Sequence, residues 1–200
     1  MNNFTAVGFD FGGVVGSKKH VMPGIAEITG VPLEQLRAAY FQNNKLANVD
    51  GMPYEKVWEI VIGQLNAMTK WQEVLAYLNE NMTVELNSEV LKIAADLKTR
   101  GLKVGLFSNN TKANGEQLRA QGLEKYFDPF VISAEIGYQK PDPKAFQIFF
   151  EKMQVAPKRA IYIDDTEQSL STVGEIGYYP ILFKDAAQLR ADLEPLGLLN

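Results

Sequence analysis

The chain has 200 residues, of which 46% are hydrophobic and 22% are charged, the composition of an ordinary globular protein with one sizeable domain or one domain that carries an insertion. Its net charge is −4 and its basic residues form no stripe, which argues against a nucleic-acid partner, while the lack of cysteine excludes disulfides and thiol chemistry. Because no apolar run approaches about 18 residues and the first residues lack the basic segment of a signal peptide, we expect a soluble, cytoplasmic protein without a membrane partner.

Five short apolar runs along the chain predict β-strands. Each is rich in apolar side chains and ends in polar or small residues, and together they span residues 4–10, 102–110, 130–135, 160–165 and 180–184. Near-continuous apolar strands are typical of a sheet that is buried on both faces, which is usually a parallel sheet.

Helical patterns alternate with these strands. Residues 87–101 repeat apolar side chains at helical spacing, with Asn87 or Ser88 suited to cap the start and Gly101 to end the helix. The alternation predicts an α/β fold whose core is a three-layer, Rossmann-like parallel sheet with right-handed crossovers.

Two further helices are expected in the second half of the chain. Asp142 is a natural N-cap and Pro143 fits the first helical position of one of them. The other is expected to begin after a capping Thr166 and to end at Gly177.

The segment from residue 16 to residue 85 interrupts the alternation. It contains no predicted strand, only helical patterns, which follow Pro32, Pro53 and Lys70. We therefore expect an α/β core at 1–15 and 86–200 and a small all-helical cap at 16–85, placed above the carboxyl end of the first strand. The aromatic residues of this segment are expected to form the interior of the cap: Tyr40, Phe41, Tyr54, Trp58, Trp71 and Tyr77.

Residues able to carry chemistry follow four of the predicted strands. Ligands of open parallel sheets bind outside the carboxyl ends of the strands, so these residues are expected to share one edge. Crowded carboxylates repel one another unless a hard cation such as Mg²⁺ neutralises them, and a hydroxyl, N–H groups and an ammonium complement phosphate oxygens. The pattern indicates phosphoryl transfer through an acyl phosphate, carried by Asp10, Ser108, Asn109, Lys140, Asp164 and Asp165.

Four motifs in order resemble those of the haloacid dehalogenase-like (HAD) hydrolases. They are "GFDFGGVV", "LFSNN", "GYQKPDP" and "IYIDDTEQSL", and they extend over essentially the whole chain. The helical segment lies where members of subfamily I with a C1-type cap carry theirs. The resemblance implies a Mg²⁺-dependent phosphatase for a small phosphorylated metabolite such as a sugar phosphate, acting as a monomer or a homodimer.

The resemblance also implies roles for single residues. Asp10 is similar to the nucleophile that becomes aspartyl phosphate. Ser108, with the backbone around Asn109, would hold the phosphoryl oxygens, and Lys140 would neutralise their charge.

For the metal, the resemblance implies that Asp10 and Asp165 bind Mg²⁺ directly, together with the backbone carbonyl of Gly12. Asp164 would act mainly through a metal-bound water. Which member of the Asp164–Asp165 pair coordinates the metal directly stays open.

The first motif departs from the family pattern at Gly12. The usual second aspartate, which serves as general acid and then base, is absent, and general acid–base catalysis contributes about 10²–10⁴-fold. A phosphatase for substrates with good leaving groups, similar to bacterial sugar-1-phosphate phosphatases, is the first interpretation. The alternatives are a non-catalytic protein that binds phosphorylated ligands, a haloacid dehalogenase, against which the paired aspartates argue, and a phosphonatase with a cap lysine at Lys18, Lys19, Lys45, Lys56 or Lys70.

Two residues are hypothetical substitutes for the missing base. His20, the single histidine, follows the first motif, and Asp50 lies within residues 48–55, a tight connection that is also our candidate for a substrate-selecting loop. An ordinary surface histidine near a hinge is the simpler interpretation of His20.

Overall fold

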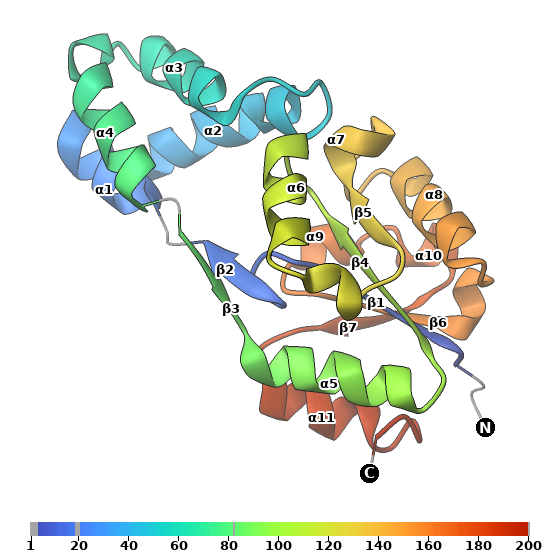
Figure 1. Ribbon diagram of the computed structural model, residues 1–200. Coiled ribbons are helices and arrows are strands. Elements are labelled where there is room, and N and C mark those ends of the chain that lie inside the picture. Colours follow the sequence, from blue (N-terminus) through green and yellow to red (C-terminus); the bar gives the residue numbers. More distant parts are fainter. Residues whose placement is uncertain (1–3, 19–20, 82, 200) are drawn as a thin grey trace.

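The computed structural model describes residues 4–18, 21–81 and 83–199, and its centre is a five-stranded sheet (Figure 1). Every neighbouring pair of strands is parallel, in the order β5-β4-β1-β6-β7. The strands are β1 (Ala6–Phe9), β4 (Lys103–Ser108), β5 (Phe130–Ile132), β6 (Ala160–Asp164) and β7 (Tyr179–Leu182). All five predicted strands and the parallel sheet are confirmed. The third strand is shorter than predicted, because the chain turns into α7 (Ser133–Ile136).

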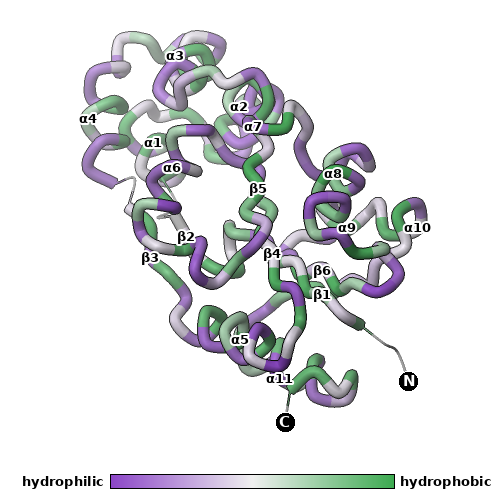
Figure 2. The backbone as a smooth tube through the Cα atoms, turned by 45° about the vertical axis from the view of Figure 1, so that its right-hand side comes forward, coloured by the Kyte–Doolittle hydropathy of each residue, from purple (hydrophilic) through white to green (hydrophobic). Residues whose placement is uncertain are grey.

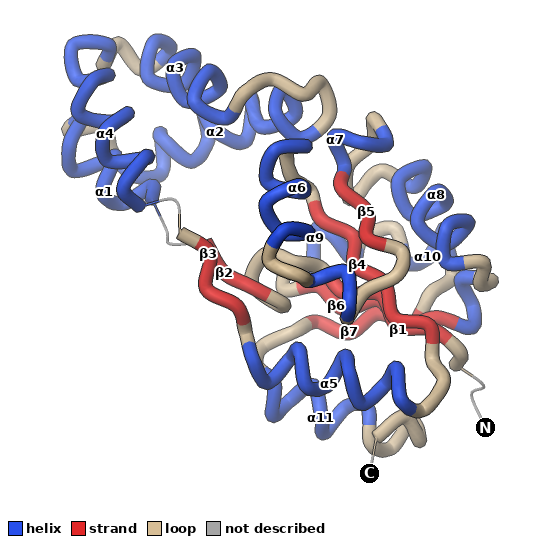
Figure 3. Tube along the Cα trace, in the orientation of Figure 1, coloured by secondary structure: helices blue, strands red, loops and turns tan. Residues whose placement is uncertain are grey.

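Side chains alternate between the two faces of the sheet. Val7 and Phe9 of β1 join one hydrophobic cluster, and Ala6 joins the other. The first cluster packs under α5 (Ser88–Thr99), α6 (Lys112–Ala120) and α11 (Ala186–Leu193). The second packs under α8 (Pro143–Met153), α9 (Glu167–Leu170) and α10 (Val173–Ile176). The strands therefore form the middle layer of three, as predicted, and Figure 3 shows helices on both sides of the sheet.

Several helix ends follow the sequence signals. Asn87 accepts a hydrogen bond from the Val90 N–H at 3.2 Å and caps α5, and the Asp142 carboxylate accepts one from the Lys144 N–H at 2.8 Å at the start of α8. The amphipathic pattern of α5 is visible in Figure 2 as alternating hydrophilic and hydrophobic segments. Three 3₁₀ helices complete the described helices: η1 (Met68–Lys70), η2 (Leu123–Lys125) and η3 (Pro157–Arg159).

The prediction of one continuous helix after residue 166 is wrong. The chain forms two short helices, α9 and α10, and the second ends at Gly177 in the left-handed conformation. The Thr166 side chain does not cap α9, because its hydroxyl hydrogen-bonds to the Asp164 carboxylate instead.

Four helices form a cap with its own hydrophobic interior. They are α1 (Val21–Thr29), α2 (Leu33–Asn48), α3 (Tyr54–Gln64) and α4 (Trp71–Asn81). Trp58 is fully buried at its centre and stacks on Tyr40, with ring centroids 4.8 Å apart. The aromatic residues expected inside the cap do pack there, except Phe41, which is 63% exposed. The prediction for Phe41 is wrong because its position on α2 points away from the other helices.

A two-stranded antiparallel ribbon lies between the cap and the sheet (Figure 3). It consists of β2 (Gly16–Lys18) and β3 (Val84–Leu86), in which Gly16 pairs with Leu86. The prediction that residues 16–85 contain no strand is therefore wrong. Three-residue strands carry too little periodicity to be recognised, and these two find each other only through the fold. The cap boundaries at residues 16 and 85 stay a prediction.

The connections of the sheet reverse direction at β1. From β1 the chain proceeds to β4 and β5 on one side and then crosses to β6 and β7 on the other. Ligands of such sheets bind at this switch point, outside the carboxyl ends of the strands. Asp10, Ser108 and Asp164 all lie at that edge. Among the described helices, none is long and apolar enough to cross a membrane.

Candidate active site

A buried lysine joins two of the strand-end aspartates. The Lys140 Nζ lies 2.7 Å from Asp10 Oδ1 and 2.6 Å from Asp164 Oδ2. All three residues are buried, with Lys140 only 3% exposed. Asp10 follows β1, Asp164 ends β6 and Lys140 lies between α7 and α8, so the fold brings Asp10 together with two residues that follow it by 130 and more positions, as the sequence predicts.

The two oxygens of Asp164 are both engaged by the protein. Lys140 binds Oδ2, while the Thr166 N–H and hydroxyl donate to Oδ1 at 3.0 and 2.8 Å. The Thr166 hydroxyl also lies 2.7 Å from the Ser169 hydroxyl. Thr166 thus fixes Asp164, a role that sequence reasoning missed because a threonine before a helix is usually a cap.

Negative charge is crowded at this edge of the sheet. Asp10, Asp164 and Asp165 each offer a carboxylate oxygen, and these oxygens lie within 4.8 Å of one another. Burial raises the pKa of the Asp10 carboxyl to about 7, an effect that the Lys140 ammonium opposes and the Asp164 and Asp165 charges reinforce. Burial and the Asp164 charge also raise the pKa of Asp165. A single ammonium therefore leaves the three carboxylates short of positive charge.

The donor set fits a hard divalent cation. Mg²⁺ prefers oxygen ligands and is usually held by one or two carboxylates, with water or substrate oxygens completing the shell. Asp165 is exposed and Asp10 is bound by Lys140 through Oδ1, so each can offer an oxygen to a cation. Asp164 has less to offer, because both of its oxygens already accept hydrogen bonds.

Lys140 is cationic in this setting and is fixed through its backbone. Burial alone lowers the pKa of the ammonium, but the charges of Asp10 and Asp164 outweigh burial and raise the pKa well above its usual range. The Asn109 side chain accepts from the Lys140 N–H at 2.8 Å and donates to the Lys140 carbonyl at 2.9 Å. The side chain of Asn109 is therefore used to position Lys140, which sequence reasoning did not foresee.

Ser108 and the turn after it lie at the same edge. Ser108 is the last residue of β4, next to β1, and is buried. Asn110, two residues after Ser108, is held in this turn by Ser133. The Asn110 N–H donates to the Ser133 hydroxyl at 2.9 Å, and the Ser133 hydroxyl donates to the Asn110 carbonyl at 3.2 Å. A rigid turn after a strand holds its backbone groups in fixed positions, as a site for phosphoryl oxygens requires.

The two glycines after Asp10 differ in what they permit. Gly13 has a φ of +74°, and a Cβ there would lie 2.2 Å from Asp165 Oδ2, so only glycine fits beside that carboxylate. A Cβ at Gly12 would lie 3.8 Å from Asp10 Oδ2, which is ordinary contact. Space for a Cβ therefore exists at Gly12, the position at which the resembled family pattern has its second aspartate.

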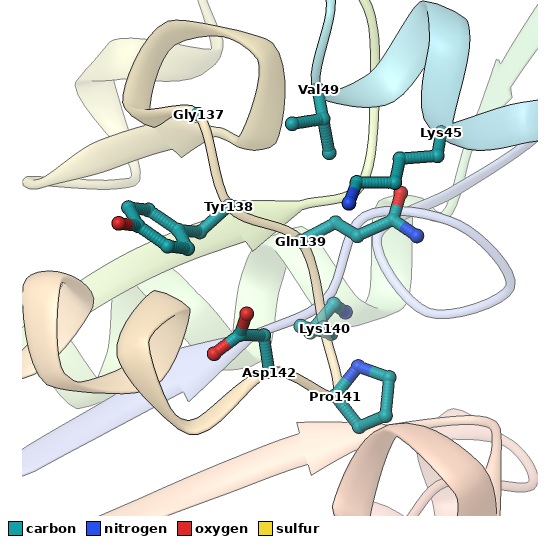
Figure 4. Close-up of a pocket in the computed structure, with 8 residues that line it drawn as sticks. All are labelled: Lys45, Val49, Gly137, Tyr138, Gln139, Lys140, Pro141 and Asp142. Atoms are coloured by element: carbon teal, nitrogen blue, oxygen red, sulfur yellow. The ribbon is translucent and has the colours of Figure 1, made fainter.

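A cavity of about 270 Å³ lies between the cap and the core beside this cluster. Lys45 and Val49 at the end of α2 face Gln139 and Lys140 of the segment between α7 and α8 (Figure 4). The helix α2 also packs against α7, so the cap contacts the core here. Val49 lies within the connection 48–55 expected to select substrate, and Lys45 is one of the cap lysines named for the phosphonatase alternative.

The remaining predictions for the cap have mixed outcomes. His20 and Lys19 lie outside the described residues, as does the side chain of Lys18. Asp50 is exposed in the connection between α2 and α3, and nothing tests its proposed role. Two cap lysines form surface ion pairs, Lys56 with Glu59 at 2.6 Å and Lys70 with Glu73 at 2.8 Å.

Comparison with known proteins gives consistent matches. Residues 9–177 match the family model of the haloacid dehalogenase-like hydrolases. Phosphatase MT3486 of Mycobacterium tuberculosis is 25% identical over 210 residues, covering 98% of this chain and 97% of that protein. Bifunctional epoxide hydrolase 2 of Rattus norvegicus is 26% identical over 114 residues, covering 54% of this chain, which spans 21% of the length of the rat protein.

One solved structure is similar over almost its whole length. It is a HAD family enzyme from Bacteroides thetaiotaomicron in complex with magnesium and inorganic phosphate. The TM-score is 0.65 at 20% sequence identity, and the match covers 93% of this chain and 98% of that chain. At this identity the likeness shows the shared fold.

Proposed function

The chain belongs to the haloacid dehalogenase-like hydrolase family, and from this membership we propose that it removes the phosphoryl group from a small phosphorylated metabolite with the help of Mg²⁺. The observation that carries the proposal is the Lys140 ammonium between Asp10 and Asp164, within a group of three carboxylates. The phosphatase names among the relatives and the magnesium and phosphate of the similar structure support it.

We assign the nucleophile to Asp10. One carboxylate oxygen bonds to phosphorus while the ester P–O bond breaks, and the leaving alkoxide takes a proton from water or departs as a stable anion. Water then attacks phosphorus, the bond to Asp10 breaks, and inorganic phosphate and one proton are released. Lys140 holds Asp10 in place and neutralises charge on the phosphoryl oxygens, which Ser108 and the Asn109 backbone also bind.

Bound Mg²⁺ would supply a divalent charge that compensates both the carboxylates and the phosphoryl group. We propose Asp10 and Asp165 as its direct side-chain ligands, with the Gly12 carbonyl. Asp164 is assigned a supporting role, because Lys140 and Thr166 occupy both of its oxygens. Of the Asp164–Asp165 pair, we therefore propose Asp165 as the direct ligand.

A direct experiment uses p-nitrophenyl phosphate and acetyl phosphate. Both have good leaving groups, so the absence of an acid at Gly12 costs little. We expect phosphate release that requires Mg²⁺ and is abolished in the Asp10→Asn variant. Release at the level of that variant, for both substrates, would refute the proposed phosphatase activity.

Gly12 supports a second candidate, a protein that binds phosphorylated ligands without turnover. The site then keeps its cation and phosphate contacts but lacks the group that transfers protons. Calorimetric titration with inorganic phosphate in the presence of Mg²⁺ separates the two candidates. Phosphate binding without any hydrolysis of acetyl phosphate would favour the binding protein.

A further inference from the structure

The cavity between α2 and the segment 137–142 adjoins the acidic cluster through one residue. Lys140 lines the cavity, and its ammonium reaches Asp10 and Asp164. The volume of about 270 Å³ lies just below the range of about 300–1,000 Å³ typical of small-molecule pockets. The leaving group of a phosphate ester held at Asp10 therefore has space for a body about the size of one sugar ring.

Two polar groups of the cavity wall lack, within the described part of the chain, a partner that a bound ligand could supply. Lys45 is exposed, and among the residues that the structure describes it forms no ion pair. The Gln139 Oε1 atom is buried and accepts no hydrogen bond from the described residues. A buried acceptor without a hydrogen bond is destabilising, and a donor on a bound ligand would relieve this cost.

The acidic group of the cavity wall is directed elsewhere. Figure 4 shows the Asp142 carboxylate and the Tyr138 ring on one side of the 137–142 segment, and Lys45 and the Gln139 amide on the other. The Asp142 carboxylate caps α8 through the Lys144 N–H. The Lys45 side of the cavity is thus positively charged and has a hydrogen-bond acceptor beside it.

We propose that this cavity selects substrates whose leaving group carries both a hydroxyl and a second anionic group. The hydroxyl donates to Gln139 Oε1, and the second anion, a carboxylate or a second phosphate, lies against the Lys45 ammonium. The inference rests on the proposed phosphatase function and specifies its substrate class: phosphorylated sugar acids or sugar bisphosphates.

Lys45 can also stabilise α2, and the experiment must distinguish this function from charge selection in the cavity. It lies in the last turn of α2, where the helix dipole favours a cation. That function predicts a lower melting temperature when the charge is removed, and no change in substrate preference. Charge selection in the cavity predicts a change in preference.

Three esters that share one glucopyranosyl ring and one 1-phosphate test the proposal: glucose 1-phosphate, glucuronic acid 1-phosphate and glucose 1,6-bisphosphate. They differ only at carbon 6, which is neutral, a carboxylate or a phosphate. We expect kcat/KM for release of the 1-phosphate to be about tenfold higher for at least one anionic ester. Lys45→Gln should bring that ratio close to one, whereas Lys56→Gln, which removes a cap lysine paired with Glu59, should preserve it.

Gln139 is tested with the same substrates. Gln139→Met keeps the side-chain length and removes the acceptor, so kcat/KM for glucose 1-phosphate should fall about tenfold relative to p-nitrophenyl phosphate, which has no hydroxyl. The carboxylate and bisphosphate arms show which anion Lys45 prefers.

The proposal is overturned if wild-type protein shows no preference for either anionic ester, or if Lys45→Gln leaves the preference unchanged. Failure of the phosphatase function would appear differently, as no release above the Asp10→Asn variant for any ester. In that case calorimetry measures the binding of the three esters to wild-type and Lys45→Gln protein. The ratio of affinities between an anionic ester and glucose 1-phosphate then takes the place of the kcat/KM ratio, with the same expected outcome.

Discussion

The side chain of Asn109 binds both backbone polar groups of Lys140, with contacts of 2.8 Å to the N–H and 2.9 Å to the carbonyl. Asn109 follows β4, and Lys140 precedes α8. This pair of hydrogen bonds holds the segment that carries the buried ammonium against the edge of the sheet.

Removing this clamp should lower turnover. We expect Asn109→Ala to reduce kcat about 10²-fold, because a shift of about 1 Å in a catalytic group can cost that much. Steady-state kinetics with p-nitrophenyl phosphate measures the effect. Asn43→Ala removes a comparable side-chain contact in the cap, to Gln64, and should leave kcat within about twofold. Equal losses in both variants would contradict a positioning role.

The raised pKa of Asp10 predicts a pH-dependent stability of the metal-free protein. Between its usual value of 3.8 and about 7, the folded protein holds a proton that the unfolded chain releases, so stability falls as pH rises through this interval. The difference corresponds to roughly 4 kcal/mol at most. In EDTA, Asp10→Asn should melt at a higher temperature than wild type at pH 8 and close to it at pH 4.

The exposed Asp50→Asn variant is the control for that comparison, and it should follow wild type at both pH values. Added Mg²⁺ should raise the melting temperature of wild type and have little effect on Asp10→Asn. A melting curve of Asp10→Asn that runs parallel to wild type across this pH range would show that Asp10 is not a destabilising buried charge.

The assignment of Asp165 predicts different defects for the two neighbouring aspartates. Asp165→Asn should raise the Mg²⁺ concentration for half-maximal activity at least tenfold, because a direct ligand loses its charge. Asp164→Asn should lower kcat more than it changes the Mg²⁺ requirement, because it removes a partner of Lys140. Titration of activity with Mg²⁺ distinguishes these effects, and the reverse pattern would assign the metal to Asp164.

The two glycines after Asp10 offer a matched pair of substitutions. Gly13→Ala should weaken Mg²⁺ binding and cost roughly 1–2 kcal/mol of stability, since its φ is positive and the new Cβ would displace Asp165. Gly12→Ala has room and should change both quantities little. Chemical denaturation and Mg²⁺ titration of both variants provide the measurement, and similar behaviour of the pair would refute this account of Gly13.

Gly12→Asp tests what the missing aspartate means. A carboxyl at this position would lie next to Asp10 and could protonate a leaving group, so alkyl phosphates should gain up to about 10²-fold in kcat. Aryl and acyl phosphates, with good leaving groups, should gain little. Comparing glycerol phosphate with p-nitrophenyl phosphate gives the ratio of gains, and a uniform loss for both would contradict the explanation.

The sheet and its charged edge were predictable because their signals are local. An apolar strand that ends in Asp10, and another that ends in Asp164, can be read from a few neighbouring residues, and parallel pairing then brings them together. The β2–β3 ribbon was not predictable, since its short strands lie 66 positions apart and acquire meaning only when they pair.

Parts of the site escaped prediction for a related reason. Thr166 and Asn109 belong to residue types that cap helices or bind ligands, and only the three-dimensional structure shows that they hold Asp164 and Lys140. Lys45 and Gln139 are ordinary polar residues in sequence, and they face one cavity because α2 packs against α7.

Because β2 and β3 run side by side, both passages of the chain into the cap lie at one pivot. Figure 1 shows α1 and α4 near this ribbon, whereas the C-terminal end of α2 lies beside α7. We expect a slight bend of the ribbon to move Lys45 of the cap relative to Gln139 of the core, while Asp10, Lys140 and Asp164 keep their spacing at the edge of the sheet. Stiffening the ribbon should slow the entry and departure of small molecules more than it slows bond cleavage.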